Sequence, residues 1–247
     1  MYQFYYPDGK LINESDQEKQ EEKFVKFYNQ CYYLEVSPSA EKEIECILKT
    51  SDPLTNEEII KILEWKTGGK YIEGKNIIQT RYGKISVAEV AEKIGTIRGP
   101  LAIDEAKSLL KELCKIDGIG MVYAITLVYF ITNGQYPIYD KFAHIALLAI
   151  FSENSDSEKE YGEIVPIKDS TYQKKINMGK TKNKILDIDG IFEQYLNGYV
   201  YPINKIFGCN YGEFIETNSN RDIDRALWSY GHLFNENEKN KKRLGVN

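Results

Sequence analysis

The feature that constrains this chain most is the sequence Ile-Asp-Gly-Ile-Gly at positions 116–120, here called the hairpin turn. It interrupts a stretch in which apolar residues recur at helical spacing from 103 to 114 and again from 121 to 131. Two glycines around one apolar residue permit a sharp turn and leave amide N–H groups free at the start of the second helix. With the helix dipole behind them, such amides suit a phosphate oxygen without a basic side chain. A plain connection between two helices has the same form, so the turn alone does not decide the function.

The residues after the second helix place a carboxylate at the start of a third. Asn133-Gly134 ends the second helix, Pro137 blocks immediate helix renewal, and Asp140 precedes apolar positions at helical spacing up to Ile150. Residues 104–150 are therefore expected to form one helix–turn–helix–loop–helix unit. Asp140 is placed to cap the third helix, and capping is compatible with a catalytic role for the same carboxylate.

The sequence of this unit resembles the helix-hairpin-helix DNA glycosylase superfamily, which includes proteins with the 8-oxoguanine glycosylase fold. Members carry a hairpin with two glycines, followed by a short motif that runs from a proline to an aspartate. The matching residues here are Leu113, Ile116, Gly118, Ile119, Gly120 and Ala124, then Pro137, Ile138, Tyr139 and Asp140. A weaker likeness lies in Asp-Arg-Ala-Leu-Trp-Ser-Tyr-Gly at 224–231, which is similar to the closing helix of that fold.

The resemblance implies a mostly α-helical, glycosylase-like fold with minor β-hairpin elements. It implies an enzyme of base excision repair that acts on double-stranded DNA with a damaged base, needing no cofactor, metal or iron–sulfur cluster. Asp140 would stabilise the cationic sugar left as the N-glycosidic bond breaks, and would orient the attacking water. Phosphate contacts are expected at Gly118, Ile119, Gly120 and Lys115.

Two departures from the family pattern affect the expected chemistry. The proline usual before the first glycine is Asp117, an acidic group near the expected phosphate. The lysine that bifunctional members use for Schiff-base chemistry falls on Val122, although the spacing of 18 residues from there to Asp140 resembles the family's. The sequence therefore predicts a monofunctional glycosylase that leaves the abasic site intact.

Other residues are weaker candidates. Lys141 offers an amine beside Asp140, yet adjacent helical residues point about 100° apart. His144 lies one turn after Asp140, where an ordinary core histidine is the favoured interpretation. A flipped base needs flat apolar walls. Trp65, Trp228 and Tyr230 are the residues chosen for that pocket, with plain core packing as their alternative role.

Composition limits the class of protein. The net charge of −5 argues against nucleic-acid binding through the overall field. Basic residues do gather in a polar segment and near the C-terminus, where solvated loops or tails are the favoured interpretation; they are Lys174, Lys175, Lys180, Lys182, Lys184 and residues 237–243. The four cysteines are far apart and are expected to be reduced and buried. Neither a membrane span nor a secretory leader is recognisable, so a cytoplasmic location is expected.

Residues 1–247 are expected to form a single glycosylase-like unit, built either as one body or as two lobes. Residues 152–183 are expected to be a polar insertion or loop. Asp8-Gly9 predicts a tight β-hairpin, and 70–85 predicts two short extended pieces. Further helices are expected at 17–34, from Thr55 to Gly68, from Ser86, at 189–196 and at 222–234, the last with Asp222 as its cap.

Two other functions fit the same residues. A non-catalytic protein that binds DNA structure would keep the hairpin while lacking excision. A protein-interaction scaffold would use the hairpin turn only as a connection, and the acidic isoelectric point mildly favours that hypothesis.

Overall fold

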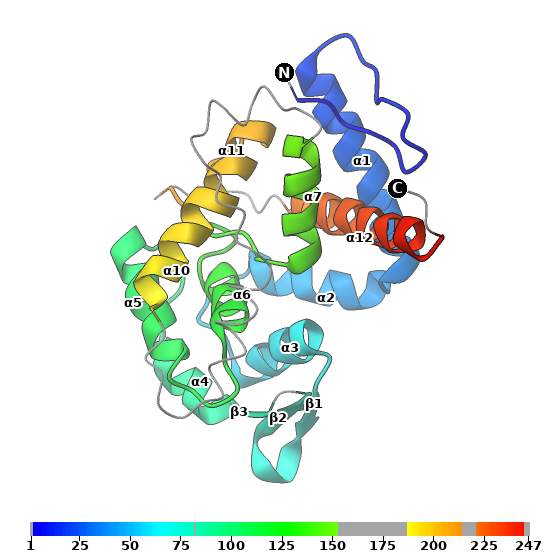
Figure 1. The fold of residues 1–247 in the computed structure, drawn as a ribbon. Helices are drawn as coiled ribbons and strands as arrows, with labels where there is room; N and C mark the ends of the chain where they lie inside the picture. The colour runs from blue at the N-terminus through cyan, green and yellow to red at the C-terminus, as the bar shows by residue number, and fades with distance from the viewer. Residues whose placement is uncertain (1, 82, 153–186, 214–220, 245–247) are drawn as a thin grey trace.

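The computed structural model describes residues 2–81, 83–152, 187–213 and 221–244 of the chain, which form a mostly helical protein with one small antiparallel sheet (Figure 1). The helices are α1 (Gln17–Glu35), α2 (Pro38–Lys49), α3 (Asn56–Thr67), α4 (Val87–Ile94), α5 (Ile103–Leu113), α6 (Met121–Ile131), α7 (Lys141–Ser152), α10 (Ile188–Tyr195), α11 (Tyr201–Phe207) and α12 (Arg221–Leu244). A single π-helical turn, η3 (Leu196–Val200), joins α10 to α11. The strands are β1 (Lys70–Ile72), β2 (Ile77–Thr80) and β3 (Gly83–Ser86), with a short 3₁₀ turn, Glu73–Lys75, after β1.

Local signals set the ends of α3 and α4 as the sequence predicts. The Thr55 side chain accepts from the Glu58 amide while the Glu58 carboxylate accepts from the Thr55 amide, which completes a capping box. Gly68 ends α3 in the left-handed conformation, at a φ of 62°. Ser86 accepts from the Glu89 amide at the start of α4. These helix boundaries are confirmed.

The sheet follows α3 and has the order β1–β2–β3. Two extended pieces were expected here, but the structure has three strands. The middle strand, β2, pairs with β1 on one side and with β3 on the other. Ile78 lies opposite Ile85, and both side chains are fully buried. The sheet thus buries one face against the helices while the other stays exposed, as an amphipathic antiparallel sheet does.

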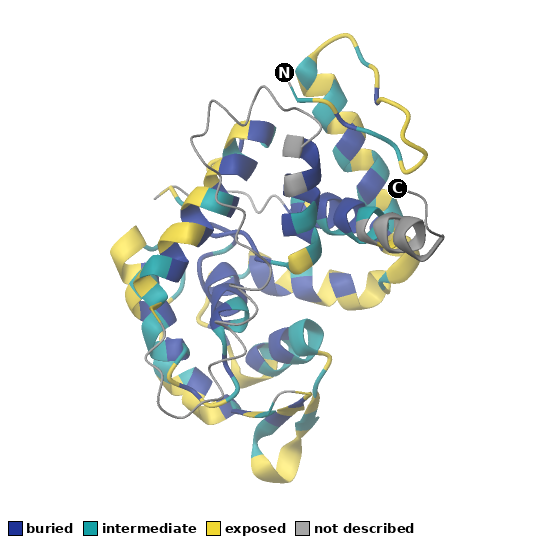
Figure 2. Cartoon of the chain, viewed as in Figure 1, coloured by how far each residue is buried: buried dark blue, intermediate teal, exposed yellow. Residues whose placement is uncertain are grey.

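The helix–turn–helix expected around residues 116–120 is present as α5, the hairpin turn and α6. Ile116 and Ile119 are buried, and the Ile119 amide donates to the Ile116 carbonyl at 3.1 Å. α6 is buried along almost its whole length and lies at the centre of the molecule (Figure 2). The following loop returns the chain to Asp140, where α7 begins.

α12 packs against both α7 and α1, which brings the C-terminal helix beside segments distant in sequence (Figure 1). The contact with α7 depends on Gly231, because a Cβ built there would lie 1.7 Å from the Phe142 carbonyl oxygen. Any larger residue would separate the two helices. This close approach sets the position of α12 relative to the start of α7.

Several expectations differ from the structure. Pro38 begins α2, a helix that was not expected from the sequence; proline is well suited to the first turn of a helix. α12 begins at Arg221, so Asp222 lies inside the first turn and is not the cap. The N-terminal hairpin forms only one isolated bridge, between Tyr5 and Leu11. The four cysteines are free as expected, but only Cys209 is buried; Cys31 and Cys114 are half-buried and Cys46 is exposed.

The polar segment expected at 152–183 lies outside the described residues except for its first position, and so do the lysines between 174 and 184. Within the part of the chain that the structure describes, no helix has the length and apolar character needed to cross a membrane.

Candidate active site

A cavity of about 290 Å³ lies where α1, α3 and α12 meet the start of α7. Its lining combines aromatic rings with both signs of charge: Tyr32, Val36, Trp65, Lys66, Ile138, Asp140, Ala143, Arg221, Asp224 and Trp228. The volume is at the lower end of the range for small-ligand sites, and apolar walls with a few polar groups are typical of them. The structure thus brings Asp140, Trp65 and Trp228, three of the predicted site residues, to one cavity.

Asp140 both caps α7 and lines the cavity. Its Oδ1 accepts from the Phe142 amide at 2.9 Å, and its backbone carbonyl accepts from the His144 amide at 2.9 Å. Its Oδ2 lies 3.3 Å from the Lys66 Nζ, and 28% of its side chain is exposed. Each carboxylate oxygen can accept more than one hydrogen bond, so capacity remains for a water or ligand.

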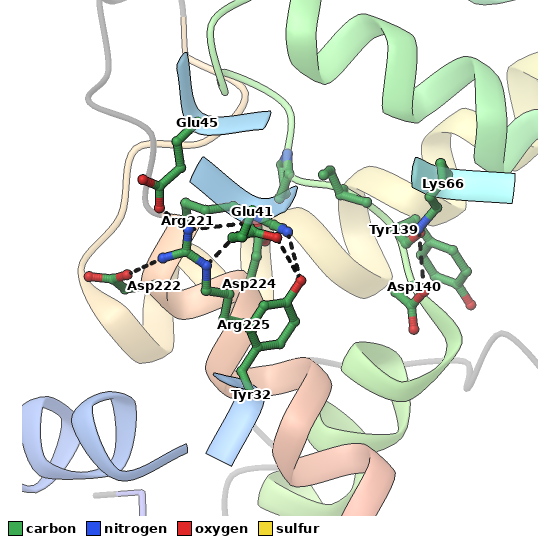
Figure 3. Close-up of polar contacts among 12 residues, drawn as sticks. Tyr32, Glu41, Glu45, Lys66, Tyr139, Asp140, Arg221, Asp222, Asp224 and Arg225 are labelled. Carbon is green, nitrogen blue, oxygen red and sulfur yellow. Dashed lines mark hydrogen bonds and ion pairs between the residues drawn. The ribbon is translucent and has the colours of Figure 1, made fainter. Parts of the chain in front are cut away.

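Lys66 is the amine beside Asp140 (Figure 3). Its Nζ also donates to the Tyr139 carbonyl oxygen at 3.4 Å, and only 10% of its side chain is exposed. Lys141, the amine that the sequence suggested, is exposed on α7 and does not line the cavity. The sequence carries no signal for the Lys66–Asp140 pair, because 74 residues separate the partners and only tertiary packing joins them.

Two buried tyrosines fix the loop that carries Asp140. The Tyr195 hydroxyl donates to the Pro137 carbonyl at 2.5 Å, and the Tyr199 hydroxyl donates to the Ile138 carbonyl at 2.9 Å. Burial raises the pKa of Tyr199 well above its ordinary value, so it remains a neutral donor. Their spacing of four residues places both rings on one side of the α10–η3 segment. The loop is therefore held at two consecutive carbonyl groups, those of Pro137 and Ile138.

The cavity walls are aromatic. Trp228 packs edge-on against Tyr32 and Phe142, at ring-centroid distances of 5.4 and 5.9 Å. The Arg221 guanidinium lies 5.0 Å from the centre of the Trp65 ring, within range of a cation–π contact. Tyr230 does not line the cavity and packs in the core against Phe24 and Tyr28. The reason is helical geometry, since residues two apart point to nearly opposite sides of a helix.

His144 is also a core residue in this structure. It is buried on α7, and its ring lies 5.7 Å from that of Tyr139 and 6.4 Å from that of Tyr199. It is not among the residues that line the cavity. Val122, at the position of the family's lysine, does not line it either and lies half-buried in the first turn of α6.

Asp224 is the second carboxyl of the cavity, and its environment differs from that of Asp140. The residue is 5% exposed, and neither carboxyl oxygen has a hydrogen-bond partner among the residues that the structure describes. Its Oδ2 lies 3.9 Å from the Arg221 Nη1, a long ion pair within the first turn of α12. Burial, only partly offset by Arg221 and Lys66, raises the pKa of Asp224 to about 7.

Beside the cavity lies a cluster of fully paired charges, here called the charge cluster and made of Tyr32, Glu41, Arg221 and Arg225 (Figure 3). Glu41 is 1% exposed, and its Oε1 accepts from the Arg221 Nε at 2.8 Å and the Arg225 Nη2 at 3.1 Å. Its Oε2 accepts from the Tyr32 hydroxyl at 2.8 Å. Burial alone would raise the pKa of Glu41, but the arginine charges and these hydrogen bonds hold it below its ordinary value.

The hairpin turn lies apart from the cavity, because none of its residues is among those that line it. Gly118 has a φ of +81°, and a Cβ built there would lie 2.7 Å from the Lys84 carbonyl oxygen. Packing alone therefore explains a glycine at position 118, because a side chain there would prevent β3 from packing against the turn. Lys84 and Asp117 are both exposed. Lys115 is exposed and pairs with Glu112.

Gly120 is the N-cap of α6, and its φ of −99° is open to other residues. The first amides of a helix have no acceptor within it, and in α6 these are the amides of Met121 and Val122, beside the half-buried Gly120. The turn thus retains the helix N-terminus that suits an anion.

Among the described residues, no group of three or more His, Cys, Asp or Glu side chains is placed to hold a metal ion. Comparisons of the whole chain with protein families, with curated proteins and with solved structures gave no match.

Proposed function

We propose that this protein is a DNA glycosylase that hydrolyses the N-glycosidic bond of a damaged base flipped out of double-stranded DNA. The observation that carries the proposal is that Asp140, Trp65 and Trp228 line one cavity although they come from three separate segments of the chain. The sequence motif selects Asp140, and the cavity supplies flat apolar walls beside it. Extruded bases are bound by stacking between aromatic or apolar side chains.

The charges around Asp140 support a role at the sugar. Lys66 pairs with one carboxylate oxygen, and the Phe142 amide donates to the other, so the carboxylate is oriented before any substrate binds. A preorganised negative charge stabilises a cationic sugar as the bond to the base breaks, and it can accept a proton from the attacking water. The two tyrosines that hold the preceding loop add to this preorganisation.

The hairpin turn is proposed to contact the DNA backbone with the first amides of α6. Hydrolysis without strand cleavage follows from Val122, which offers no amine, and from Lys66, whose ammonium is held by Asp140. Borohydride should therefore trap no covalent adduct with DNA. A trapped adduct would contradict this part of the proposal, and its loss in Lys66→Met would identify the amine.

The test is single-turnover excision from duplexes that carry a panel of damaged bases. Asp140→Asn keeps the size and some capping ability of the residue but removes the charge. Excision should fall by two or more orders of magnitude, which corresponds to about 3 kcal/mol of lost transition-state stabilisation. Duplex affinity should change little. Asp104→Asn is the matched control, since it removes an exposed carboxylate from the first turn of α5 and should leave excision unchanged.

Full excision by Asp140→Asn would reduce Asp140 to a helix cap. Duplex binding without excision of any base would favour a non-catalytic DNA-binding protein. Absence of duplex binding at every salt concentration would favour the interaction scaffold instead.

A further inference from the structure

The cavity holds two carboxyl groups in opposite environments. Asp140 is partly exposed, accepts a backbone hydrogen bond and is paired with Lys66. Asp224 is nearly fully buried, and its oxygens have no hydrogen-bond partner among the described residues. A buried carboxyl without hydrogen-bond partners is costly in its charged form, so a native structure that keeps one calls for an explanation.

The groups that surround Asp224 come from every side of the cavity. Arg221 on α12 and Lys66 on α3 favour its ionised form, whereas Glu41 on α2 and Asp140 before α7 oppose it. Tyr199 and Tyr211 lie close enough for the charge of Asp224 to raise their own pKa values, and His144 packs over Tyr199. Tyr32 and Arg225 complete this polar shell and are engaged with Glu41.

Burial dominates this balance and raises the pKa of Asp224 to about 7. At neutral pH the group is therefore divided between its acid and its carboxylate. Where two carboxyls share a site and their surroundings separate their pKa values, the one with the raised pKa serves as the acid and the other as the charged partner.

The chemistry of base release gives such an acid a use. When the bond between C1′ and the base nitrogen breaks, its electron pair stays on the base. A base that is neutral before cleavage would leave as an anion, so a proton delivered to it lowers the barrier; a base that is already cationic leaves as a neutral molecule without one.

We propose that Asp224 is the general acid that protonates the departing base, while Asp140 serves the sugar; this inference rests on the proposed glycosylase function. The C1′–N bond breaks, and the Asp224 proton passes to the base. Water forms the new C1′–O bond, and its proton passes to Asp140. Exchange with solvent returns both groups to their starting states, so the net reaction consumes one water.

The proposal defines a substrate class. The cavity should release bases that are neutral until they leave, such as deaminated or oxidised purines, with help from Asp224. Alkylated bases with a fixed positive charge should not need it. Asp224 lines the same cavity as Asp140, so both carboxyl groups face a base and sugar that are bound there.

The experiment compares two duplexes, one with hypoxanthine and one with 7-methylguanine, under single-turnover conditions. Asp224→Asn should slow release of hypoxanthine by about 100-fold or more, the usual contribution of a general acid, and release of 7-methylguanine by less than about 3-fold. Wild-type release of hypoxanthine should decline above about pH 7, whereas release of 7-methylguanine should not. Asp222→Asn, which removes an exposed carboxylate two residues earlier on α12, should leave both rates unchanged.

Equal slowing of both bases by Asp224→Asn would overturn the general-acid role and leave the glycosylase proposal standing. If the wild type releases 7-methylguanine but not hypoxanthine, the general-acid role is likewise overturned and the glycosylase proposal stands. If only hypoxanthine is released, the decline above pH 7 must disappear in Asp224→Asn, and its persistence would overturn the role. If the wild type releases no base from any duplex, the glycosylase proposal fails and this inference fails with it. Thermal unfolding of each variant shows that it is folded.

Discussion

The first turns of α12 carry two kinds of buried charge. Arg221 and Arg225 meet Glu41 in a cluster whose charged groups are hydrogen-bonded. Asp224, on the same helix, lines the cavity without a hydrogen bond among the described residues. Saturated buried charges are explained by the fold that they hold together, whereas an unsatisfied one is a feature that folding alone does not account for. We propose that this difference separates a structural charge from a functional one within a single helix.

The largest effect expected from this comparison is on stability and comes from the charge cluster. Glu41→Ala would leave Arg221, Arg225 and Tyr32 without their shared acceptor. Removing one partner of a buried ion pair costs about 3–5 kcal/mol of unfolding free energy, because the remaining charge stays buried. Denaturant unfolding measures the loss. Glu43→Ala on the exposed face of α2 is the control and should cost less than about 0.5 kcal/mol. A loss below 1 kcal/mol for Glu41→Ala would mean that the cluster is not structural.

The next effect concerns Asp224 and depends on pH. Its folded pKa of about 7 lies above the ordinary value of 3.8, so the folded protein keeps a proton that the unfolded chain releases. The stability that this proton provides is fully present below pH 3.8 and is lost as pH rises to about 7. A shift of about three pKa units corresponds to at most about 4 kcal/mol.

Asp224→Asn cannot titrate, so its stability should rise relative to the wild type between pH 4 and 7 and stay level above that range. Unfolding of both proteins at pH 5 and at pH 8 gives the comparison. Parallel stability profiles would show that Asp224 is ionised throughout, which would remove its distinction from the charge cluster.

The sequence predicted the local parts of the candidate site. The hairpin turn, the start of α7 at Asp140 and the capping box at Thr55 each depend on residues within a few positions of one another. Trp65 and Trp228, chosen from the sequence as pocket residues, both line the cavity. Their assignment to a base pocket stays a prediction.

The parts that the sequence could not predict join distant segments. Lys66 meets Asp140 across 74 residues, and Arg221 meets Glu41 across 180. A charged residue on an amphipathic helix is ordinarily solvated, and only the packing of α12 against its neighbours changes that environment. Tyr195 and Tyr199 show the same limit, since their helical spacing indicates a shared face but not the loop that this face holds.

The smallest expected effect tests a third kind of charge, the exposed Asp117 in the hairpin turn. Among the residues that the structure describes, no hydrogen bond or ion pair of its side chain explains an acid at this position, and the backbone of Lys84 on β3 packs against the neighbouring Gly118. If the turn meets a DNA phosphate, Asp117 repels it, and Asp117→Lys should tighten binding to all duplexes alike and steepen the salt dependence by about one or two ions. Stability should change by less than about 0.5 kcal/mol, because the side chain is exposed. Glu73→Lys makes the same change of charge on the exposed turn after β1, outside the hairpin turn, and is the control for net charge. Equal tightening in both variants would mean that only the overall charge matters. In that case the hairpin turn would not be a DNA contact, and the cavity would have to be explained without it.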